Sequence, residues 1–314
     1  MTNLSQVSYF IFSAYFDTGP FKYLYFTIVM SLYVFIFGSN LLLIVVICVN
    51  RSLHEPMYMF LCSLFVNELY GSTGLFPFLL LQILSDVHTV SAPLCFLQIF
   101  CLYTYANIEF YNLAIMSYDR YLAICYPLQQ GSSISYHTHM TLNKVAKLIV
   151  LTWLFPILNI VVMISLNASL QLCGHTVDTL YCNNYSVMKL ACFDTTVNNI
   201  YGLVYTFTVL IGLAFLNLFT YVKILKVCFS GSKQTRQKAI STCTPHLASL
   251  LNFSFGCFFE IVQSRFNMSR APMILRVFLS IYFLTCQPVF NPVLYGLKLT
   301  KIQLICKSLL FGKI

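Results

Sequence analysis

Seven long apolar runs follow one another along the chain, each bounded by polar, Gly or Pro residues. None shows the two-residue alternation of a barrel strand, and in lipid every backbone polar group must be satisfied within a helix or a closed barrel. The runs therefore predict membrane-spanning α-helices. They cover residues 23–49, 57–83, 93–125, 142–167, 196–228, 237–263 and 271–295.

The composition agrees with a chain whose main solvent is lipid. Of 314 residues, 59% are hydrophobic and 9% are charged, against about 25% charged in an ordinary soluble domain. The first apolar run is too long for the core of a signal peptide and no basic segment precedes it, so we expect an uncleaved anchor. The sequence therefore predicts an all-α integral membrane protein, a seven-transmembrane helix bundle without a separate soluble domain.

Lys and Arg residues gather on one side of the predicted bundle. Most of the 18 follow runs one, three, five and seven or precede runs four and six. By the positive-inside rule, this distribution places the N-terminus outside the cell and the C-terminus in the cytosol. The net charge of +9 then reflects topology and anionic lipid, and it does not indicate nucleic-acid binding. We expect an extracellular tail over 1–22, a transmembrane bundle over 23–297 and a cytosolic helix and tail over 298–314.

Two cytosolic segments are rich in basic residues. From Lys298 to Leu310, basic and apolar positions alternate as in a short amphipathic helix at the membrane surface, and Cys306 is a candidate for acylation. Between Lys233 and Lys238, the basic residues predict an edge that faces anionic lipid or a cytosolic partner. An ordinary solvated helix end is the alternative.

Four of the 13 cysteines lie outside the predicted helices or at a helix start. Thiols inside helices usually act as small apolar packing residues. Cys95 stands at the outer start of the third run, and Cys173, Cys182 and Cys192 lie in the outer loop between the fourth and fifth runs. They face an oxidising compartment, and the sequence leaves all three pairings open. On the same side, Asn3 begins the glycosylation sequon that we favour.

Several motifs resemble those of one receptor family. Pro56-Met-Tyr-Met-Phe-Leu opens the second run, Met116-Ser-Tyr-Asp-Arg-Tyr closes the third, and Asn291-Pro-Val-Leu-Tyr closes the seventh. Lys238-Ala-Ile-Ser-Thr-Cys-Thr-Pro-His-Leu opens the sixth run and is the most specific of these motifs. The chain thus resembles the odorant receptor family of rhodopsin-like G-protein-coupled receptors over nearly all of residues 24–310.

The resemblance implies a receptor that binds a small-molecule odorant and activates a heterotrimeric, olfactory-type stimulatory G-protein to raise cyclic AMP. It also implies residence in the plasma membrane of olfactory sensory neuron cilia, and disulfide bonds that join Cys95 to Cys182 and Cys173 to Cys192. Such bonds would hold a lid over the ligand pocket and limit its disorder.

A charged triplet, Asp119-Arg120-Tyr121, lies at the predicted cytosolic end of the third helix. A charged pair near the membrane interior is costly unless it is satisfied, so it is a functional candidate, with a membrane-edge anchor as the alternative. The resemblance implies that Arg120 faces the G-protein while neighbouring tyrosines rearrange around it. The residues expected in coupling and activation are Asp119, Arg120, Tyr121, Tyr221, Lys238, His246, Asn291, Pro292 and Tyr295.

Two carboxylates, Glu68 and Glu109, fall near the expected bilayer midplane. Glu109 precedes Asp119 by ten residues, which is about 15 Å along a helix. Together with Asn291, the two acids are candidates for binding a sodium ion or sharing a proton, as the resemblance also implies. The alternative is two separate neutral carboxyl groups, each with its own hydrogen bonds.

The resemblance also places a ligand pocket between the third, fifth, sixth and seventh helices. Its residues are apolar and aromatic with a few polar groups, as in many small-molecule sites, although such a stripe is often simple packing. Leu102 stands where amine receptors carry an aspartate, which argues against an amine held in that way. The expected pocket residues are Leu102, Tyr103, Ala106, Asn107, Tyr205, Thr206, Phe255, Phe258, Val262, Ile281 and Thr285.

Basic residues surround the predicted outer mouth of the pocket. We hypothesise that they favour an anionic or strongly polar odorant, with attraction to lipid headgroups as the alternative. They are Lys189, Arg265, Arg270 and Arg276.

Other functions fit the sequence less well. A transporter would normally show internal repeats, which the chain lacks. An enzyme would need a convergent nucleophile or metal set, and His137-x-His139 has no further ligands nearby. A non-olfactory class A receptor for a lipid or peptide remains the main alternative.

Overall fold

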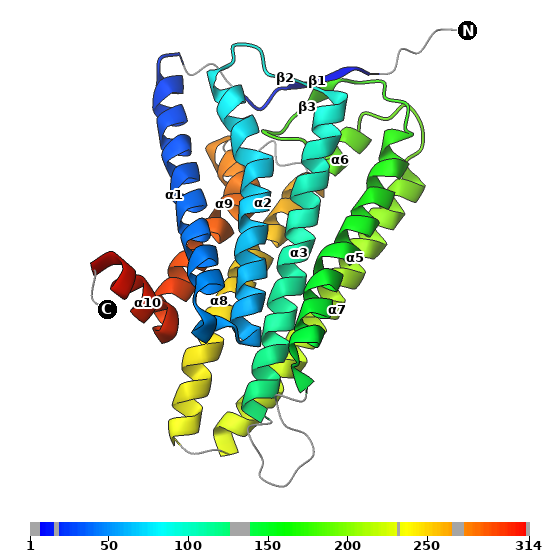
Figure 1. The fold of residues 1–314 in the computed structure, drawn as a ribbon. Helices are drawn as coiled ribbons and strands as arrows, with labels where there is room; N and C mark the ends of the chain where they lie inside the picture. The colour runs from blue at the N-terminus through cyan, green and yellow to red at the C-terminus, as the bar shows by residue number, and fades with distance from the viewer. Residues whose placement is uncertain (1–6, 16–18, 126–138, 231–232, 266–272, 312–314) are drawn as a thin grey trace.

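The computed structural model describes residues 7–15, 19–125, 139–230, 233–265 and 273–311. Within these ranges, seven long helices form a single bundle (Figure 1). Each has at least 26 residues, which at 1.5 Å per residue exceeds the roughly 30 Å of a bilayer core. They are α1 (Phe21–Val49), α2 (Pro56–Leu84), α3 (Ala92–Cys125), α5 (Leu142–Ala168), α7 (Thr196–Ser230), α8 (Lys233–Arg265) and α9 (Met273–Lys298). The prediction of a seven-helix bundle is confirmed.

The smaller elements lie at the two ends of the bundle. We call the end of the bundle that the sequence predicts to face outward the outer end, and the opposite end the inner end. The outer end carries β1 (Tyr9–Phe12), β2 (Thr89–Ser91), β3 (Thr176–Val177) and α6 (Asn184–Met188). At the other end, the 3-10 turn η1 (Arg51–Leu53) links α1 to α2, and α10 (Thr300–Phe311) follows α9. The predicted amphipathic C-terminal helix is therefore present: Ile302 is fully buried against the bundle, whereas Leu304 and Lys301 are exposed.

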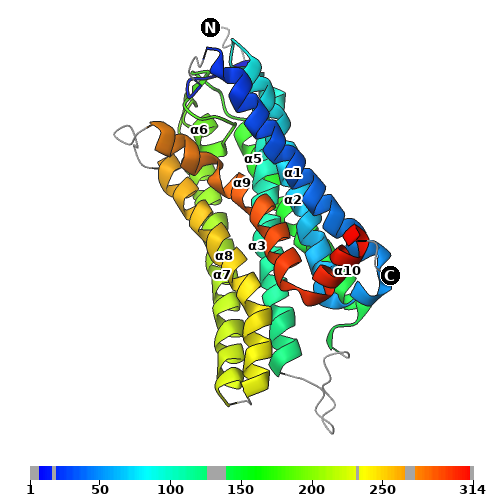
Figure 2. The same cartoon turned by 90° about the vertical axis from the view of Figure 1, so that its left-hand side faces the viewer.

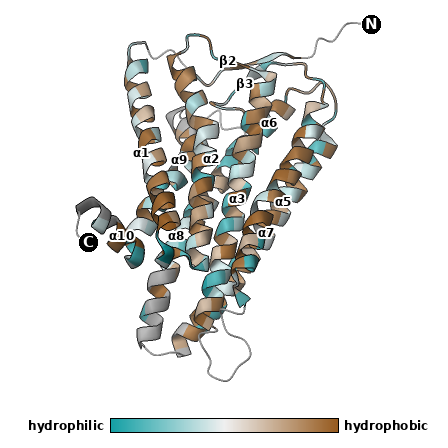
Figure 3. Ribbon diagram, viewed as in Figure 1, coloured by the Kyte–Doolittle hydropathy of each residue, from teal (hydrophilic) through white to brown (hydrophobic). Residues whose placement is uncertain are grey.

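Of the helices within the described residues, five are long and apolar enough by composition alone to cross a membrane. The helices α3 and α9 fall outside this group. The reason for α3 is its central place, because it contacts α2, α5, α7 and α8 and buries polar residues such as Thr104, Glu109 and Asn112 among them. Figure 3 shows hydrophilic stretches along α3, whereas α1 and α5 show mostly apolar colour. In Figure 2, α9 lies between α8 on one side and α1 and α2 on the other.

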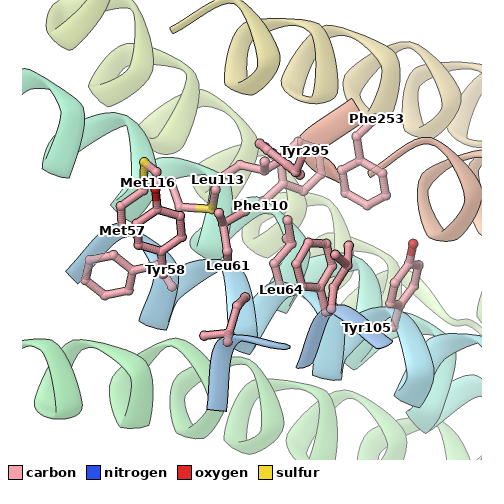
Figure 4. Packing of buried hydrophobic residues seen from close by; sticks show 14 of the residues in the cluster. Met57, Tyr58, Leu61, Leu64, Tyr105, Phe110, Leu113, Met116, Phe253 and Tyr295 are labelled. Atoms are coloured by element: carbon pink, nitrogen blue, oxygen red, sulfur yellow. The ribbon is translucent and has the colours of Figure 1, made fainter. Parts of the chain in front are cut away.

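The bundle core gathers aromatic and aliphatic side chains from α2, α3, α8 and α9 (Figure 4). Phe253 packs edge-on against Tyr105 at a centroid distance of 6.2 Å and lies 4.7 Å from Phe110. Tyr295 packs edge-on against Phe65. All of these except Phe110 are fully buried. Many other large apolar residues point away from the bundle, for example Phe215 at 66% exposure, as a lipid-facing surface requires.

Proline leaves a carbonyl without its partner, and another helix supplies one. Pro292 has no N–H, so the carbonyl of Pro288 loses its bond from four residues ahead. The Nδ2 atom of Asn40 in α1 donates to that carbonyl at 2.9 Å. Asn40 is fully buried, so this bond ties α1 to α9 where the backbone is interrupted.

A small sheet covers the outer end of the bundle. β1 is its central strand, antiparallel to β2 and parallel to β3. Phe10 and Phe12 are buried beneath the sheet, and Phe12 meets Phe78 of α2 edge-on at 5.5 Å. The sequence was expected to form only an extracellular tail here. The tail instead contributes a strand to a lid over the bundle.

Candidate ligand cavity and inner coupling residues

A cavity of about 140 Å³ lies beneath the outer loop, between α3, α7 and α8. Ligand sites of drug size are typically about 300–1,000 Å³, so this one suits a small molecule. Its wall is largely apolar, with a few polar side chains. The lining residues are Leu102, Tyr103, Ala106, Asn107, Phe110, Tyr181, Asn183, Thr206, Val209, Cys257, Glu260 and Ile261.

Two disulfide bonds hold the roof of this cavity. Cys95 of α3 is bonded to Cys182, which places the neighbouring loop residues Tyr181 and Asn183 over the cavity. The backbone N–H of Cys182 also donates to Oε1 of Gln98 at 2.9 Å. The second bond, between Cys173 and Cys192, closes the loop on itself. Both pairs are those that the resemblance implies.

Glu260 is the acidic group of the cavity, and only one of its oxygens is satisfied. The Tyr181 hydroxyl donates to Glu260 Oε1 at 2.8 Å, and Asn183 Nδ2 donates to the same oxygen at 3.3 Å. Glu260 Oε2 is buried without a hydrogen-bond partner. Burial, reinforced by the nearby Glu260 carboxylate, holds the pKa of the Tyr181 hydroxyl well above its usual range, so Tyr181 remains a donor.

The predicted residues of α3 line this cavity together with one from α7. Leu102, Tyr103, Ala106 and Asn107 share one face of α3, and Thr206 faces them from α7. Phe258 instead lines a second, larger cavity of about 710 Å³ between α7 and α8, which also has Tyr103 and Thr206 in its wall. The deep end of that cavity reaches Asn217 and Tyr221.

The remaining predicted pocket residues lie elsewhere. Tyr205 lines a shallow groove on the face of α7 that also holds the exposed residues Ile200 and Val204. Phe255 is 53% exposed and packs against Phe259 and Tyr282. On α8 the positions that line this cavity are Cys257, Glu260 and Ile261, spaced as one helical face. Phe255 and Val262 are not among the described residues that line it.

The two α9 positions are also absent from the described wall of the cavity. Ile281 packs against the main core cluster. The Thr285 hydroxyl donates to the backbone carbonyl of Ile281 at 2.8 Å, so its hydrogen bond is made within its own helix.

Part of the predicted basic rim is engaged by an aromatic ring. The Arg265 guanidinium lies 4.1 Å and the Lys189 ammonium 4.5 Å from the ring centroid of Tyr185. Arg265 also donates to Asn199 Oδ1 at 2.5 Å. Arg270 lies outside the described residues, and so does the side chain of Arg276.

The candidate ion-site residues come together in the middle of the bundle. Asn291 Nδ2 donates to Glu68 Oε1 and, at 3.0 Å, to Glu109 Oε1. Tyr105 donates to the other oxygen of Glu68 at 3.0 Å, and Asn67 Nδ2 to the other oxygen of Glu109 at 3.0 Å. All five side chains are fully buried. The two carboxyl groups are therefore one connected cluster and not two separate sites.

At the inner end, Arg120 is paired with its neighbour. Its Nε donates to Asp119 Oδ2 at 3.0 Å, and a second guanidinium nitrogen contacts the same oxygen. Asp119 is fully buried. A small apolar cluster nearby joins three helices, where Tyr121 of α3 and Tyr221 of α7 pack against Cys243 of α8.

Four further coupling candidates lie where α8 meets α9. The Tyr295 hydroxyl and His246 Nδ1 are 3.2 Å apart, and both side chains are buried. Asn291 and Pro292 are buried one turn earlier on α9. Three other positions fall outside what the structure describes: Asn3, and the side chains of Lys238 and Cys306.

The sequence analysis missed Glu260, Tyr181 and Asn183. Glu260 carried a usable signal, because a carboxylate within an apolar run is expensive unless it is paired or functional. The same reasoning had selected Glu68 and Glu109. Tyr181 and Asn183 carried none except their position beside Cys182.

Known proteins resemble this chain in sequence, and a solved structure resembles it in fold. A family model described as "Olfactory receptor" matches residues 29–313. Human olfactory receptor 11A1 is 31% identical over 98% of this chain and 96% of its own length. Human olfactory receptor 6N1 is 32% identical over 96% of this chain and 94% of its own. The crystal structure of squid rhodopsin matches with a TM-score of 0.72 at 16% identity, over 94% of this chain and 82% of that one.

Proposed function

The chain belongs to the olfactory receptor family, and we propose from this premise that it binds a small-molecule odorant in the 140 Å³ cavity and activates a stimulatory, olfactory-type G-protein that raises cyclic AMP. Members of this family are multi-pass plasma-membrane signalling receptors and not enzymes. The cavity carries the proposal, because it is small, mostly apolar and supplied with a few converging polar groups, as small-molecule sites are.

One helix supports a route from the cavity to the cytosolic side. Five residues of α3 between Leu102 and Phe110 line the cavity, and Asp119 and Arg120 follow on the same helix. The opposite wall belongs to α8, which carries His246 further along. The two helices can adopt a closed and an open arrangement. A ligand that binds one arrangement more tightly at the outer end shifts the population toward that arrangement, and so changes the spacing of α3 and α8 at the inner end as well.

The inner end holds groups suited to a two-state change. Separating α3 from α8 breaks the packing of Tyr121 and Tyr221 around Cys243 and frees Arg120 to leave Asp119. The exposed arginine then faces the G-protein. The position of the Asp119–Arg120 pair supports this role, because a charged side chain near the membrane interior is costly unless it is paired.

The buried cluster of Glu68, Glu109 and Asn291 suits a sodium ion. Carboxylate oxygens, of the kind that Glu68 and Glu109 supply, are ligands that hard cations prefer. Asn291 turns its amide N–H toward these oxygens, and its own oxygen accepts from Ser249. Two further buried oxygens nearby, Ser72 Oγ and Asn67 Oδ1, have no hydrogen-bond partner. A sodium ion bound by the two carboxylates would offset their charge and favour the closed arrangement of α2, α3 and α9.

The receptor is proposed to lie in the plasma membrane of olfactory cilia, with the N-terminus outside and the C-terminus in the cytosol. The distribution of Lys and Arg supports this orientation, and Asn3 would then be available for glycosylation. Epitope tags at the two ends, stained before and after permeabilisation, test it. Tags that report the same side of the membrane contradict it.

An odorant screen with a cyclic AMP readout tests the main proposal. Cells that express the full chain and an olfactory stimulatory G-protein are exposed to a broad odorant panel, and agonists raise cyclic AMP. Arg120→Gln abolishes the response at equal surface expression, whereas Lys301→Ala, which removes an exposed inner cation, leaves it unchanged. Responses confined to lipids or peptides would instead indicate a non-olfactory receptor.

A further inference from the structure

Glu260 is a buried acid to which the protein offers too few donors. Its Oε1 accepts two hydrogen bonds, from Tyr181 and Asn183, while Oε2 accepts none. Buried polar atoms are almost always satisfied, and a group left without a partner calls for an unseen one. Because Glu260 lines the cavity, a bound ligand is in a position to supply it.

The cations nearest in the chain are committed elsewhere. Arg265 lies five residues further along α8, but it stacks on Tyr185 and donates to Asn199. Lys189 lies over the same tyrosine ring. Among the described residues, Glu260 forms no ion pair. A carboxylate removed from water without a countercharge is strongly unfavourable, so a cation bound beside Glu260 would stabilise its ionised form.

The rest of the cavity sets the shape of the missing partner. Leu102, Ala106 and Phe110 form its α3 wall, and Val209 and Ile261 lie opposite. These side chains suit a short hydrocarbon chain. The polar groups Glu260, Tyr181 and Asn183 are joined by hydrogen bonds beneath the outer loop. Asn107 and Thr206 also line the cavity, but the Asn107 amide donates to the backbone carbonyl of Tyr103 within its own helix. A ligand with one polar head at Glu260 matches this arrangement.

We propose that Glu260 makes this cavity selective for small apolar amines, whose ammonium group donates to Glu260 Oε2 while the hydrocarbon chain lies against α3. The inference rests on the proposed odorant site and names its ligand class. An amine anchored from α8 is consistent with Leu102 on α3, where no acid is present.

An amine fits better than the neighbouring ligand classes. A carboxylic acid would bring a second negative charge beside Glu260 and would bind more weakly for that reason. An alcohol can donate to Oε2 but supplies no countercharge. A hydrogen bond to an ionised group is roughly twice as strong as a neutral one, and an ammonium adds to it the attraction between opposite charges that an alcohol lacks.

The test uses three odorants of one chain length: hexylamine, hexanol and hexanoic acid. In the cyclic AMP assay, the wild-type receptor responds to hexylamine at the lowest concentration. Glu260→Gln keeps the size of the side chain but removes its charge, and it raises the half-maximal concentration of hexylamine about tenfold or more. Its response to hexanol changes much less.

A matched control and a reversed charge complete the design. Asp194→Asn removes an exposed acid on the outer side, where the side chain accepts from the backbone N–H of Thr196, and leaves the hexylamine response unchanged. Glu260→Lys shifts the preference toward hexanoic acid. If Glu260→Lys fails to reach the cell surface, Glu260→Gln alone carries the comparison.

Thermal stabilisation of the purified receptor separates this inference from the proposed function. Hexylamine raises the melting temperature of the wild type and not that of Glu260→Gln. If it does so while no odorant raises cyclic AMP, the signalling proposal fails and the ligand inference stands. If hexanoic acid or hexanol stabilises the wild type as well as hexylamine does, or if no amine stabilises it, the inference is overturned.

Discussion

The Tyr15 hydroxyl donates a 2.7 Å hydrogen bond to the backbone carbonyl of Leu180. This bond joins the N-terminal segment to the residue that precedes Tyr181, which in turn contacts Glu260. The ring of Tyr15 also stacks on His88 at a centroid distance of 4.6 Å. The N-terminal segment therefore helps to position the roof of the cavity.

Removing the Tyr15 hydroxyl should loosen that roof. We expect Tyr15→Phe to lower the stability of the purified receptor by about 1 kcal/mol, the usual net value of one hydrogen bond, measured as a lower melting temperature. Tyr9→Phe is the control, because Tyr9 is 49% exposed and its ring contact with His175 does not need the hydroxyl. Equal melting temperatures for the two variants would contradict the role of the bond.

The contact between Gly71 and Tyr105 predicts a strong effect of one methyl group. A Cβ atom on Gly71 would collide with the ring of Tyr105, which donates to Glu68. Gly71→Ala should therefore destabilise the receptor by about 1–3 kcal/mol through overpacking. Gly38→Ala on α1 meets no atom within 4 Å and should be neutral or slightly stabilising. Similar melting temperatures for both variants would contradict this prediction and show that the Tyr105 ring moves aside at little cost.

The pair between Asp119 and Arg120 predicts higher basal signalling when it is weakened. Asp119→Asn keeps the shape of the side chain and removes its charge, so the arrangement with Arg120 released gains on the order of fivefold in population for a loss of about 1 kcal/mol. The measurement is cyclic AMP without odorant at equal surface expression. Glu55→Gln, an exposed acid on the same side, serves as the control. A basal level no higher than in the wild type would argue against a restraining role for the pair.

The ion pair between Lys301 and Glu55 should matter little at neutral pH. The hydrogen bond to Glu55 raises the pKa of Lys301. A raised pKa contributes stability that is complete below the usual lysine value of about 10.4 and is lost only as the pH rises above it. Both side chains are more than half exposed, so a double-mutant cycle should give less than about 1 kcal/mol, constant from pH 6 to 8. A coupling that falls within that pH range would require another titrating group.

The sodium proposal predicts a salt-specific stabilisation. Relative to choline chloride at the same ionic strength, sodium chloride should stabilise the wild type by about 1.4 kcal/mol when sodium is at ten times its Kd. The measurement is a higher melting temperature in sodium chloride. Glu68→Gln should remove this difference, while Glu55→Gln should retain it. A wild-type receptor that does not distinguish the two salts contains no sodium site of this kind.

The hydropathy of the sequence predicted where the helices lie. The polar residues within the apolar runs predicted which positions face the interior of the bundle. The positions of Glu68, Glu109 and Asn291 could be predicted to converge, because charged and amide groups in lipid must find one another. Apolar residues carry no such information. Lipid and the bundle core both accept Phe255, so its hydrophobicity could not show that it points away from the cavity.

The outer sheet was harder to foresee. The strand Tyr9–Phe12 is four residues long and apolar at every position, so its inward and outward sides look alike in the sequence. Its partners lie far away along the chain, with Ile11 opposite Thr89 on one side and Thr176 on the other. Only the folded bundle brings these segments to one end.

The pairing of Ile11 with Thr176 imposes an order on biosynthesis. The strand that is translated early becomes the middle of the lid. It can pair with β2 once α2 and the segment after it have been made, but its other edge has no partner until the fourth long helix and the loop after it follow. A chain that stalls before Thr176 would therefore present one open edge of β1 to the folding and quality-control machinery.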